Sequence, residues 1–498
     1  MSQLFTSDSE IEKIDSIVSC IQKSGIPKNA NIVRFAHLVD PEVKGLDLPS
    51  KLKVYYAGPL SLIVKQTFDK AGFISTRDQT LKFNVCWGAP KPMEWYQTLA
   101  PGQIINQWPG SAALGNKGVM ARCGNTANKR DERFDVWQKT FVLPSDSVSL
   151  QREMVDYPLK WFIYKPVNAN RGEGIKLVRS GDRIDFTKDV VVQHYMKNPL
   201  LVNSRKFDLR IYVLITSIDP LVIYVYKKGL ARFASKTYEK PSRANKRQNH
   251  IHLTNFSQNK GEVTDFPTKI ELHDILTILS QNPQLFDEKA SVSTDNIYEK
   301  LLNEIHRTVR LGILAAEPKL YQAAHQAQCA HSFPRRCFGL YGFDIIFDVL
   351  GNPKLLEMNI SPSTETSTDI DLEIKSKLII DIMDLVGVNV PKLIPQFGVN
   401  NGSQRSNYLP KAKGFLGFQL EAGELKYSNQ TNFQKKLDTE DLTRFEKRVL
   451  QQIIDEQTRL GDFQRLLPDQ GYRSYYESER YLNNLVECFV EYGLKGEL

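Results

Sequence analysis

The strongest constraint on the fold is a predicted β-hairpin at residues 341–361, which read YGFDIIFDVLGNPKLLEMNIS. Two apolar runs flank Gly351-Asn352, a pair typical of tight turns. Because side chains alternate along a strand, Asp344 and Asp348 should share one face of the first run. Glu357 and Asn359 should likewise share one face of the second run. The turn then places Asp344 roughly opposite Asn359 and near Glu357.

Two carboxylates and an amide oxygen inside apolar strands suggest a bound cation. Such groups are costly to bury unless something satisfies them. A set of oxygen ligands suits Mg²⁺, which also binds substrate phosphates. A surface hairpin with outward polar residues would alternate in the same way, so the pattern alone leaves both interpretations open.

A glycine loop forms a second candidate element, in KPVNANRGEGIKLV at residues 165–178. Lys165 is expected to end a strand, and Arg171 and Gly172 to lie in a tight loop before the next one. Glycine there would let backbone N–H groups approach phosphates, and the two cations would supply charge. The loop lacks the GK[ST] of a Walker A motif, and ordinary hairpin turns also contain RGxG.

The run KFDLRIYV is a third candidate element, because it alternates charged and apolar residues. Lys206, Asp208 and Arg210 should lie on one face, with Arg232 on a neighbouring strand. This face is either exposed to solvent or the floor of an anionic site. The segment HLTNFSQNK adds short polar groups that can orient a nucleotide or amino acid, namely His252, Thr254, Asn255 and Ser257. His252 alone is more often structural than catalytic, and the residues suggest no nucleophilic triad.

Composition excludes several classes of protein. The 498 residues contain 65 Lys+Arg against 57 Asp+Glu, and 41% are hydrophobic, which is ordinary for globular proteins. Six cysteines without CxxC spacing predict neither a disulfide framework nor a zinc site. No apolar run reaches the roughly 18–20 residues of a membrane span, and the acidic N-terminus lacks a secretory signal. We therefore expect a soluble, cytosolic protein.

Patterning along the chain predicts six segments. They are a polar leader (1–27), a small α/β domain (28–101), a central subdomain (102–196), a β-rich C-terminal subdomain with the metal site (197–391), a polar linker (392–440) and a helical segment (441–498). Residues 102–133 are expected to be loop because they are rich in Gly and Asn. A basic run between Lys236 and His250 is either a solvated loop or an attraction for an acidic partner, whether nucleic acid or peptide.

Six motifs, together with their order along the chain, resemble those of the tubulin tyrosine ligase-like family. They are KPVNANRGEGI, VVQHYMKNPLLVNSRKFDLRIYVLIT, GLARFAS, HLTNFS, YGFDIIFD and LLEMNISPS, preceded by INQWPGSAALGNKG. The resemblance covers roughly residues 30–390, and the C-terminal tail is most similar to the polyglutamylase branch. It implies an ATP-grasp fold of class α/β (α+β).

The resemblance also implies roles for matching residues. ATP would contact Lys117, Lys165, Arg171, Gly172, Gln193, His194, Tyr195, Met196, Lys206, Phe207, Asp208, Thr254 and Asn255. Mg²⁺ would be held by Asp344, Glu357 and Asn359, and the added amino acid would face Arg232, Phe256, Ser257 and Lys375. Phe256 stands where many polyglutamylases have tyrosine. We assign catalytic roles to Glu357 through the metal and to Arg210 as the donor to a tetrahedral oxyanion.

The implied activity is ATP-dependent addition of free L-glutamate to glutamate side chains in acidic tubulin tails, through an acyl phosphate. The implied location is the cytoplasmic cytoskeleton, including cilium or basal body, with no nucleic acid partner. A glycine or tyrosine ligase on the same fold is an alternative, although Arg232 and Lys375 favour an anionic donor. A non-catalytic microtubule-binding protein is another, although the intact set of Asp344, Glu357 and Asn359 argues against it.

Overall fold

A computed structural model describes residues 32–43, 52–77, 83–100, 102–169, 172–259, 261, 266–290, 296–332, 335–389, 442–477 and 480–493. The predicted leader (1–27) and linker (392–440) lie outside these residues. Among the described residues, no helix combines the length and the apolar character needed to cross a membrane.

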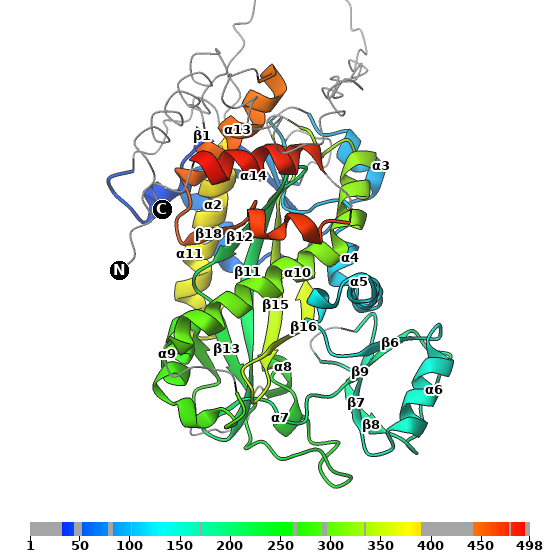
Figure 1. Cartoon of the computed structure of the whole chain (residues 1–498). Coiled ribbons are helices and arrows are strands. Elements are labelled where there is room, and N and C mark those ends of the chain that lie inside the picture. The colour runs from blue at the N-terminus through cyan, green and yellow to red at the C-terminus, as the bar shows by residue number, and fades with distance from the viewer. Residues whose placement is uncertain are drawn as a thin grey trace, which may run out of the picture.

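An antiparallel eight-stranded sheet forms the centre of the molecule (Figure 1). Its main path runs β14 (Lys269–Glu271), β13 (Leu230–Phe233), β11 (Arg205–Ile218), β12 (Leu221–Tyr226) and β18 (Phe463–Leu467). Strands β10 (Leu201–Val202) and β15 (Gly339–Phe347) also pair with β11, and β16 (Pro353–Asn359) pairs with β15. The run KFDLRIYV lies in β11, Arg232 lies on the neighbouring β13, and the predicted hairpin forms β15 and β16.

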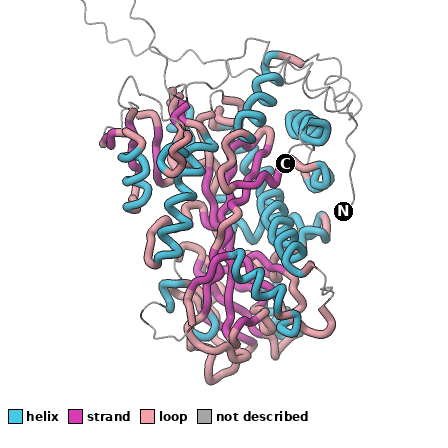
Figure 2. The backbone as a smooth tube through the Cα atoms, turned by 90° about the vertical axis from the view of Figure 1, so that its left-hand side faces the viewer, coloured by secondary structure: helices cyan, strands magenta, loops and turns pink. Residues whose placement is uncertain are grey.

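Helices cover both faces of the central sheet, as Figure 2 shows from the side. Alternate residues of β11, such as Ile211 and Val213, pack in one core with α10 (Ile297–Gln326). The intervening residues, such as Tyr212 and Leu214, pack in a second core with α11 (Asp369–Val386). Because both faces are buried there, the second half of β11, residues 211–218, reads as a largely apolar run, unlike its charged first half.

Two smaller sheets flank the central one. The N-terminal sheet is parallel, in the order β3 (Ile74–Thr76), β2 (Lys53–Ala57), β4 (Val85–Gly88) and β5 (Ile104–Ile105). Helices α2 (Leu62–Lys70) and α3 (Met93–Gln97) connect its strands. The other sheet is antiparallel, in the order β6 (Thr140–Leu143), β9 (Val190–His194), β7 (Trp161–Pro166) and β8 (Lys176–Arg179), with α6 (Ser147–Asp156) against it. This is the mixed α+β architecture expected of the ATP-grasp fold.

The remaining described elements are short or peripheral. They are β1 (Ile32–Val33) paired with β17 (Val388–Asn389), η1 (Phe35–Leu38), η2 (Glu132–Phe134), α7 (Asn249–His252), α8 (Phe256–Asn259), α9 (Leu272–Gln281), η3 (Pro283–Leu285), α13 (Arg444–Gln457), η5 (Gln470–Tyr475) and α14 (Tyr481–Gly493).

Three local expectations were wrong. Residues 102–133 are not a loop, because they contain β5, α4 (Ala112–Gly115) and α5 (Lys117–Arg130). Asn116 caps α5 by accepting a hydrogen bond from the Val119 N–H, and buried Met120, Cys123 and Ala127 supply its apolar face. The segment 441–498 is not wholly helical, because β18 extends the central sheet. In the hairpin, Asp344 lies opposite Glu357 rather than Asn359, because Phe347 pairs with Pro353 and the connection therefore spans residues 348–352 rather than two residues. A register shift between Asp344 and Ile345 then places Glu357, instead of Leu356, opposite Asp344.

Candidate active site

A row of charged side chains crosses four adjacent strands of the central sheet. Register places Arg232 of β13 opposite Asp208 of β11, Arg210 of β11 opposite Asp344 of β15, and Asp344 opposite Glu357 of β16. Since cross-strand partners point to the same face, these side chains form one band across the sheet in the first half of β11.

Two arginines hold Asp344 in this row. Arg210 donates from Nε and Nη2 to its two carboxylate oxygens at 2.6 and 3.1 Å, and Arg232 Nη2 lies 2.8 Å from Oδ2. Burial alone would raise the pKa of Asp344, but the two guanidinium groups hold it well below its usual range. Arg232 also donates to both oxygens of Asp208, at 2.6 and 2.9 Å. The four groups therefore form one continuous ionic network.

Glu357 differs from the other carboxylates of the row because it has no arginine partner among the described residues. Asn359 donates to it over a long 3.4 Å. Burial, followed by the neighbouring Asp344 carboxylate, raises the pKa of Glu357. A carboxylate that is partly buried beside a second carboxylate and an amide is relieved by a cation, so the oxygen-only set Asp344, Glu357 and Asn359 fits Mg²⁺.

Lys165 faces this row from the sheet of β6 to β9. Its ammonium donates to Gln193 Oε1 at 2.9 Å and to the Leu356 carbonyl at 3.4 Å, directly before Glu357 in the chain. Gln193 in turn donates to Thr140 Oγ1 at 3.0 Å. Burial lowers the pKa of Lys165. A small pocket lined by Lys117, Lys165, Gln193 and apolar side chains of α5 lies beside them.

Lys206 anchors a second polar cluster at the same end of the sheet. It donates to the Tyr195 hydroxyl at 3.1 Å and to the His252 carbonyl at 2.8 Å. Burial lowers the pKa of Lys206 to about 7. Thr254 donates to Asp208, which joins this cluster to the row. Met196 is buried in the same segment. The Asn255 carbonyl accepts hydrogen bonds from the Gln258 N–H and from the Asn259 side-chain amide, both at 3.0 Å, at the start of α8.

Some predicted site residues have side chains outside these clusters. The His194 ring turns to α6, where Nε2 lies 2.8 Å from Glu153, and burial lowers its pKa to about 4. Phe207 points to the opposite face of β11 and packs against Phe233. Lys375 is paired with Asp371 at 2.8 Å on α11, and burial lowers its pKa.

Arg171 lies outside the described residues. Gly172 has φ +80°, and a Cβ there would lie 2.9 Å from the Gln258 side chain, so glycine is required for both reasons. Phe256 and Ser257 begin α8.

The sequence analysis missed three partners. Glu153 is buried between Lys139 and His194, Asp371 binds Lys269 and Lys375, and Thr140 orients Gln193. For Asp371, the i,i+4 spacing to Lys375 on a helix was a usable signal. The other partners come from separate strands and helices, which no local pattern connects.

Comparison with known proteins matches this chain to the family that its sequence motifs resemble. Residues 97–394, more than half of the chain, match the family model described as "Tubulin-tyrosine ligase family". The chain is 28% identical over 457 residues to "Tubulin polyglutamylase ttll-4" of Caenorhabditis briggsae, covering 88% of this chain and 72% of the relative. It is 30% identical over 462 residues to mouse "Tubulin monoglutamylase TTLL4", covering 85% of this chain and 36% of the relative. It is also 30% identical over 461 residues to human "Tubulin polyglutamylase TTLL5", covering 86% and 34%. The chain thus spans only about a third of the mammalian relatives.

Proposed function

Because the chain belongs to the tubulin-tyrosine ligase family, we propose that it is an ATP-dependent ligase that adds glutamate to glutamate side chains of tubulin tails. The observation that carries this proposal is the charged row, where Glu357 has no arginine partner among the described residues. Lys165 and Lys117 partly offset the rise in its pKa, and Arg210 binds the neighbouring Asp344. Such a site is suited to a metal-bound triphosphate and to an anionic acceptor.

Phosphoryl transfer provides the leaving group that the reaction needs. An oxygen of the acceptor carboxylate attacks the γ-phosphorus of ATP, the bond to ADP breaks, and an acyl phosphate forms. The amine of the donor amino acid then attacks the acyl carbon, inorganic phosphate leaves, and the nitrogen loses a proton. The result is one amide bond for each ATP cleaved.

Each step has a group in this chain to assist it. Lys165 and Lys117 would neutralise phosphate oxygens, and Lys206 with the 193–196 segment would bind the rest of the nucleotide. Glu357, Asn359 and Asp344 would hold Mg²⁺, which supplies charge neutralisation at the phosphates when bound. Arg210, held rigidly by Asp344, would stabilise the oxyanion formed when the amine attacks.

An acidic peptide would approach through the loop that follows β13. Lys236, Lys240, Arg243 and Arg247 are exposed there, and Lys246 pairs with Asp182, in the turn after β8, at 2.6 Å. A cluster of exposed cations attracts acidic tails and raises the association rate. We propose that this loop steers the acceptor.

A donor-competition assay tests the proposed function. The full chain is incubated with tubulin, ATP, Mg²⁺ and labelled glutamate, glycine or tyrosine, and the tails are analysed by mass spectrometry. We expect glutamate on glutamate side chains, with ADP released in equal amount. If glycine or tyrosine is added in preference, that amino acid is the donor instead of glutamate. If the chain binds tubulin without cleaving ATP, it is a non-catalytic binding protein.

Because the pKa of Lys206 is low, we expect the protein to take up a proton when it binds ATP. With a pKa of about 7, Lys206 is largely neutral at pH 8, and nearby phosphates should raise its pKa and draw in a proton. We expect uptake of roughly one proton per ATP at pH 8, falling toward zero at pH 6, where the amine is already charged. Calorimetry in HEPES and Tris, whose ionisation enthalpies differ, measures it.

The matched variants for this prediction are Lys206→Met and Lys240→Met. Lys206→Met should abolish the uptake, whereas Lys240→Met, which removes an exposed lysine, should leave it unchanged. Equal binding heats of wild type in both buffers at pH 8 would contradict the prediction.

A further inference from the structure

Two histidines and a carboxylate meet at the end of β11 opposite to the charged row. Asp219 lies in the turn between β11 and β12, His325 lies in the last turn of α10, and His331 follows in the loop before β15. The cysteine spacing predicted no zinc site in this chain. These three residues were not recognised in the sequence because Asp219 is more than 100 positions from both histidines, at 106 and 112 residues.

The geometry of the three side chains is convergent. His325 Nε2 lies 3.0 Å from Asp219 Oδ2, and His331 Nε2 lies 2.7 Å from the same oxygen. One ligand atom from each residue falls within 4.8 Å of the other two. The two rings are perpendicular, with centroids 4.9 Å apart, so both nitrogens point at the carboxylate from different directions.

We infer that Asp219, His325 and His331 form a binding site for a divalent transition metal, most suitably Zn²⁺. Bonds of about 2.0–2.2 Å to two imidazole nitrogens and one carboxylate oxygen place tetrahedral ligands roughly 3.3 Å apart. The two nitrogen–oxygen separations of 3.0 and 2.7 Å would open by about 0.3 and 0.6 Å, and the two histidine nitrogens lie within 4.8 Å of each other. Two nitrogen ligands and a single oxygen favour Zn²⁺ over Mg²⁺, which prefers oxygen alone. A metal would take the place of the two hydrogen bonds to Asp219, because each histidine must then present an unprotonated Nε2 to the metal.

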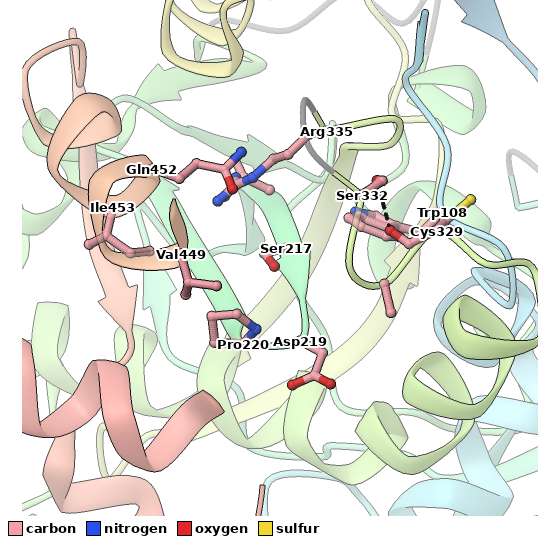
Figure 3. A pocket seen from close by; sticks show the side chains of 12 residues that line it. Trp108, Ser217, Asp219, Pro220, Cys329, Ser332, Arg335, Val449, Gln452 and Ile453 are labelled. Atoms are coloured by element: carbon pink, nitrogen blue, oxygen red, sulfur yellow. Dashed lines mark hydrogen bonds between the residues drawn. The ribbon is translucent and has the colours of Figure 1, made fainter. Parts of the chain in front are cut away.

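The site can be reached from solvent. The His325 side chain is 34% exposed and that of His331 17%, while that of Asp219 is 6% exposed. Beside it lies a pocket to which Asp219, Cys329, Ser332 and Gln452 contribute (Figure 3). Figure 3 shows the Asp219 carboxylate at the edge of this pocket rather than projecting into it. Water can therefore occupy the fourth coordination position.

Position in the fold indicates a structural role for the metal. Asp219 is nine residues from Arg210, about 30 Å along an extended strand, so the metal takes no part in ligation. The three ligands connect the β11–β12 turn to the end of α10 and to the following loop. His331 also packs on Phe445 of α13, with ring centroids 5.4 Å apart. A metal here would cross-link the β11–β12 turn to α10 and to the loop before β15, and would fix the ring of His331 against α13.

A zinc titration of the chelator-treated full chain tests this inference, with excess Mg²⁺ present to occupy the oxygen site. We expect one Zn²⁺ per chain by elemental analysis, a higher Tm on adding Zn²⁺, and tetrahedral d–d absorption with Co²⁺. His325→Gln and His331→Gln keep a side-chain N–H toward Asp219 but lose the imidazole ligand. Each should weaken Zn²⁺ binding at least about 10-fold.

His273→Ala is the matched control, because it removes an exposed histidine from another helix. It should bind Zn²⁺ like the wild type. Near-ultraviolet circular dichroism and ATP binding verify that the glutamine variants are folded. Failure of the wild type to bind Zn²⁺, or equal binding by a folded double glutamine variant, would overturn the inference and leave a hydrogen-bonded structural cluster.

Discussion

Glu357→Gln is expected to lower the ligase activity by at least about 100-fold while leaving the Tm at least as high as that of the wild type. In the wild type the ionised form of Glu357 is destabilised, because burial and the neighbouring Asp344 carboxylate raise its pKa. A neutral amide of the same shape relieves that repulsion, so Tm should stay equal or rise. The same amide cannot replace the charge that a metal between two carboxylates requires.

Glutamate incorporation into tubulin and thermal unfolding measure the two halves of this prediction. Glu373→Gln is the matched control, because Glu373 is exposed on α11 and pairs with Lys228. It should keep full activity. A Glu357→Gln enzyme that works within a few-fold of the wild type would remove Glu357 from the metal site. A large fall in Tm would instead make Glu357 a structural residue.

Arg232→Met is expected to lower the free energy of unfolding by about 3–5 kcal/mol and to reduce activity with every donor. The sequence suggested that Arg232 pairs the side-chain carboxylate of the donor. In the structure its guanidinium already binds Asp208 and Asp344. Removing it leaves two buried carboxylates with fewer partners, although Thr254 still donates to Asp208 and Arg210 to Asp344.

A double-variant cycle distinguishes the two roles of Arg232. If its main role is in the network, Asp208→Asn combined with Arg232→Met should recover part of the lost stability in urea unfolding. A stable Arg232→Met protein whose kcat/KM falls for glutamate alone would support direct donor recognition. The same measurements with Lys375→Met, which breaks the pair with Asp371, show whether the second predicted donor contact behaves alike.

Much of the fold was predictable because its signals are local. The alternation of charged and apolar residues in β11 and the hairpin of β15 and β16 each depend on neighbouring residues, although the connection spans residues 348–352 rather than Gly351-Asn352 alone. The prediction of a loop at 102–133 was wrong because it relied on the Gly and Asn content of the segment. The helix signal there is Asn116, which caps α5 just before its apolar face. Strand β18 was missed because its short run gains its structure by pairing with β12.

The sequence by itself determined which charged residues share one face of a strand, since the alternation of side chains depends only on neighbouring positions. It could not determine what each charge contacts. A single register shift after Asp344 set Glu357 opposite it, and the distant strands β11 and β13 supplied the arginines that bind Asp344. Asp219, His325 and His331 were likewise joined only by folding. Pairing across strands depends on register and on which elements pack together, and both are settled by the whole chain rather than by any local segment.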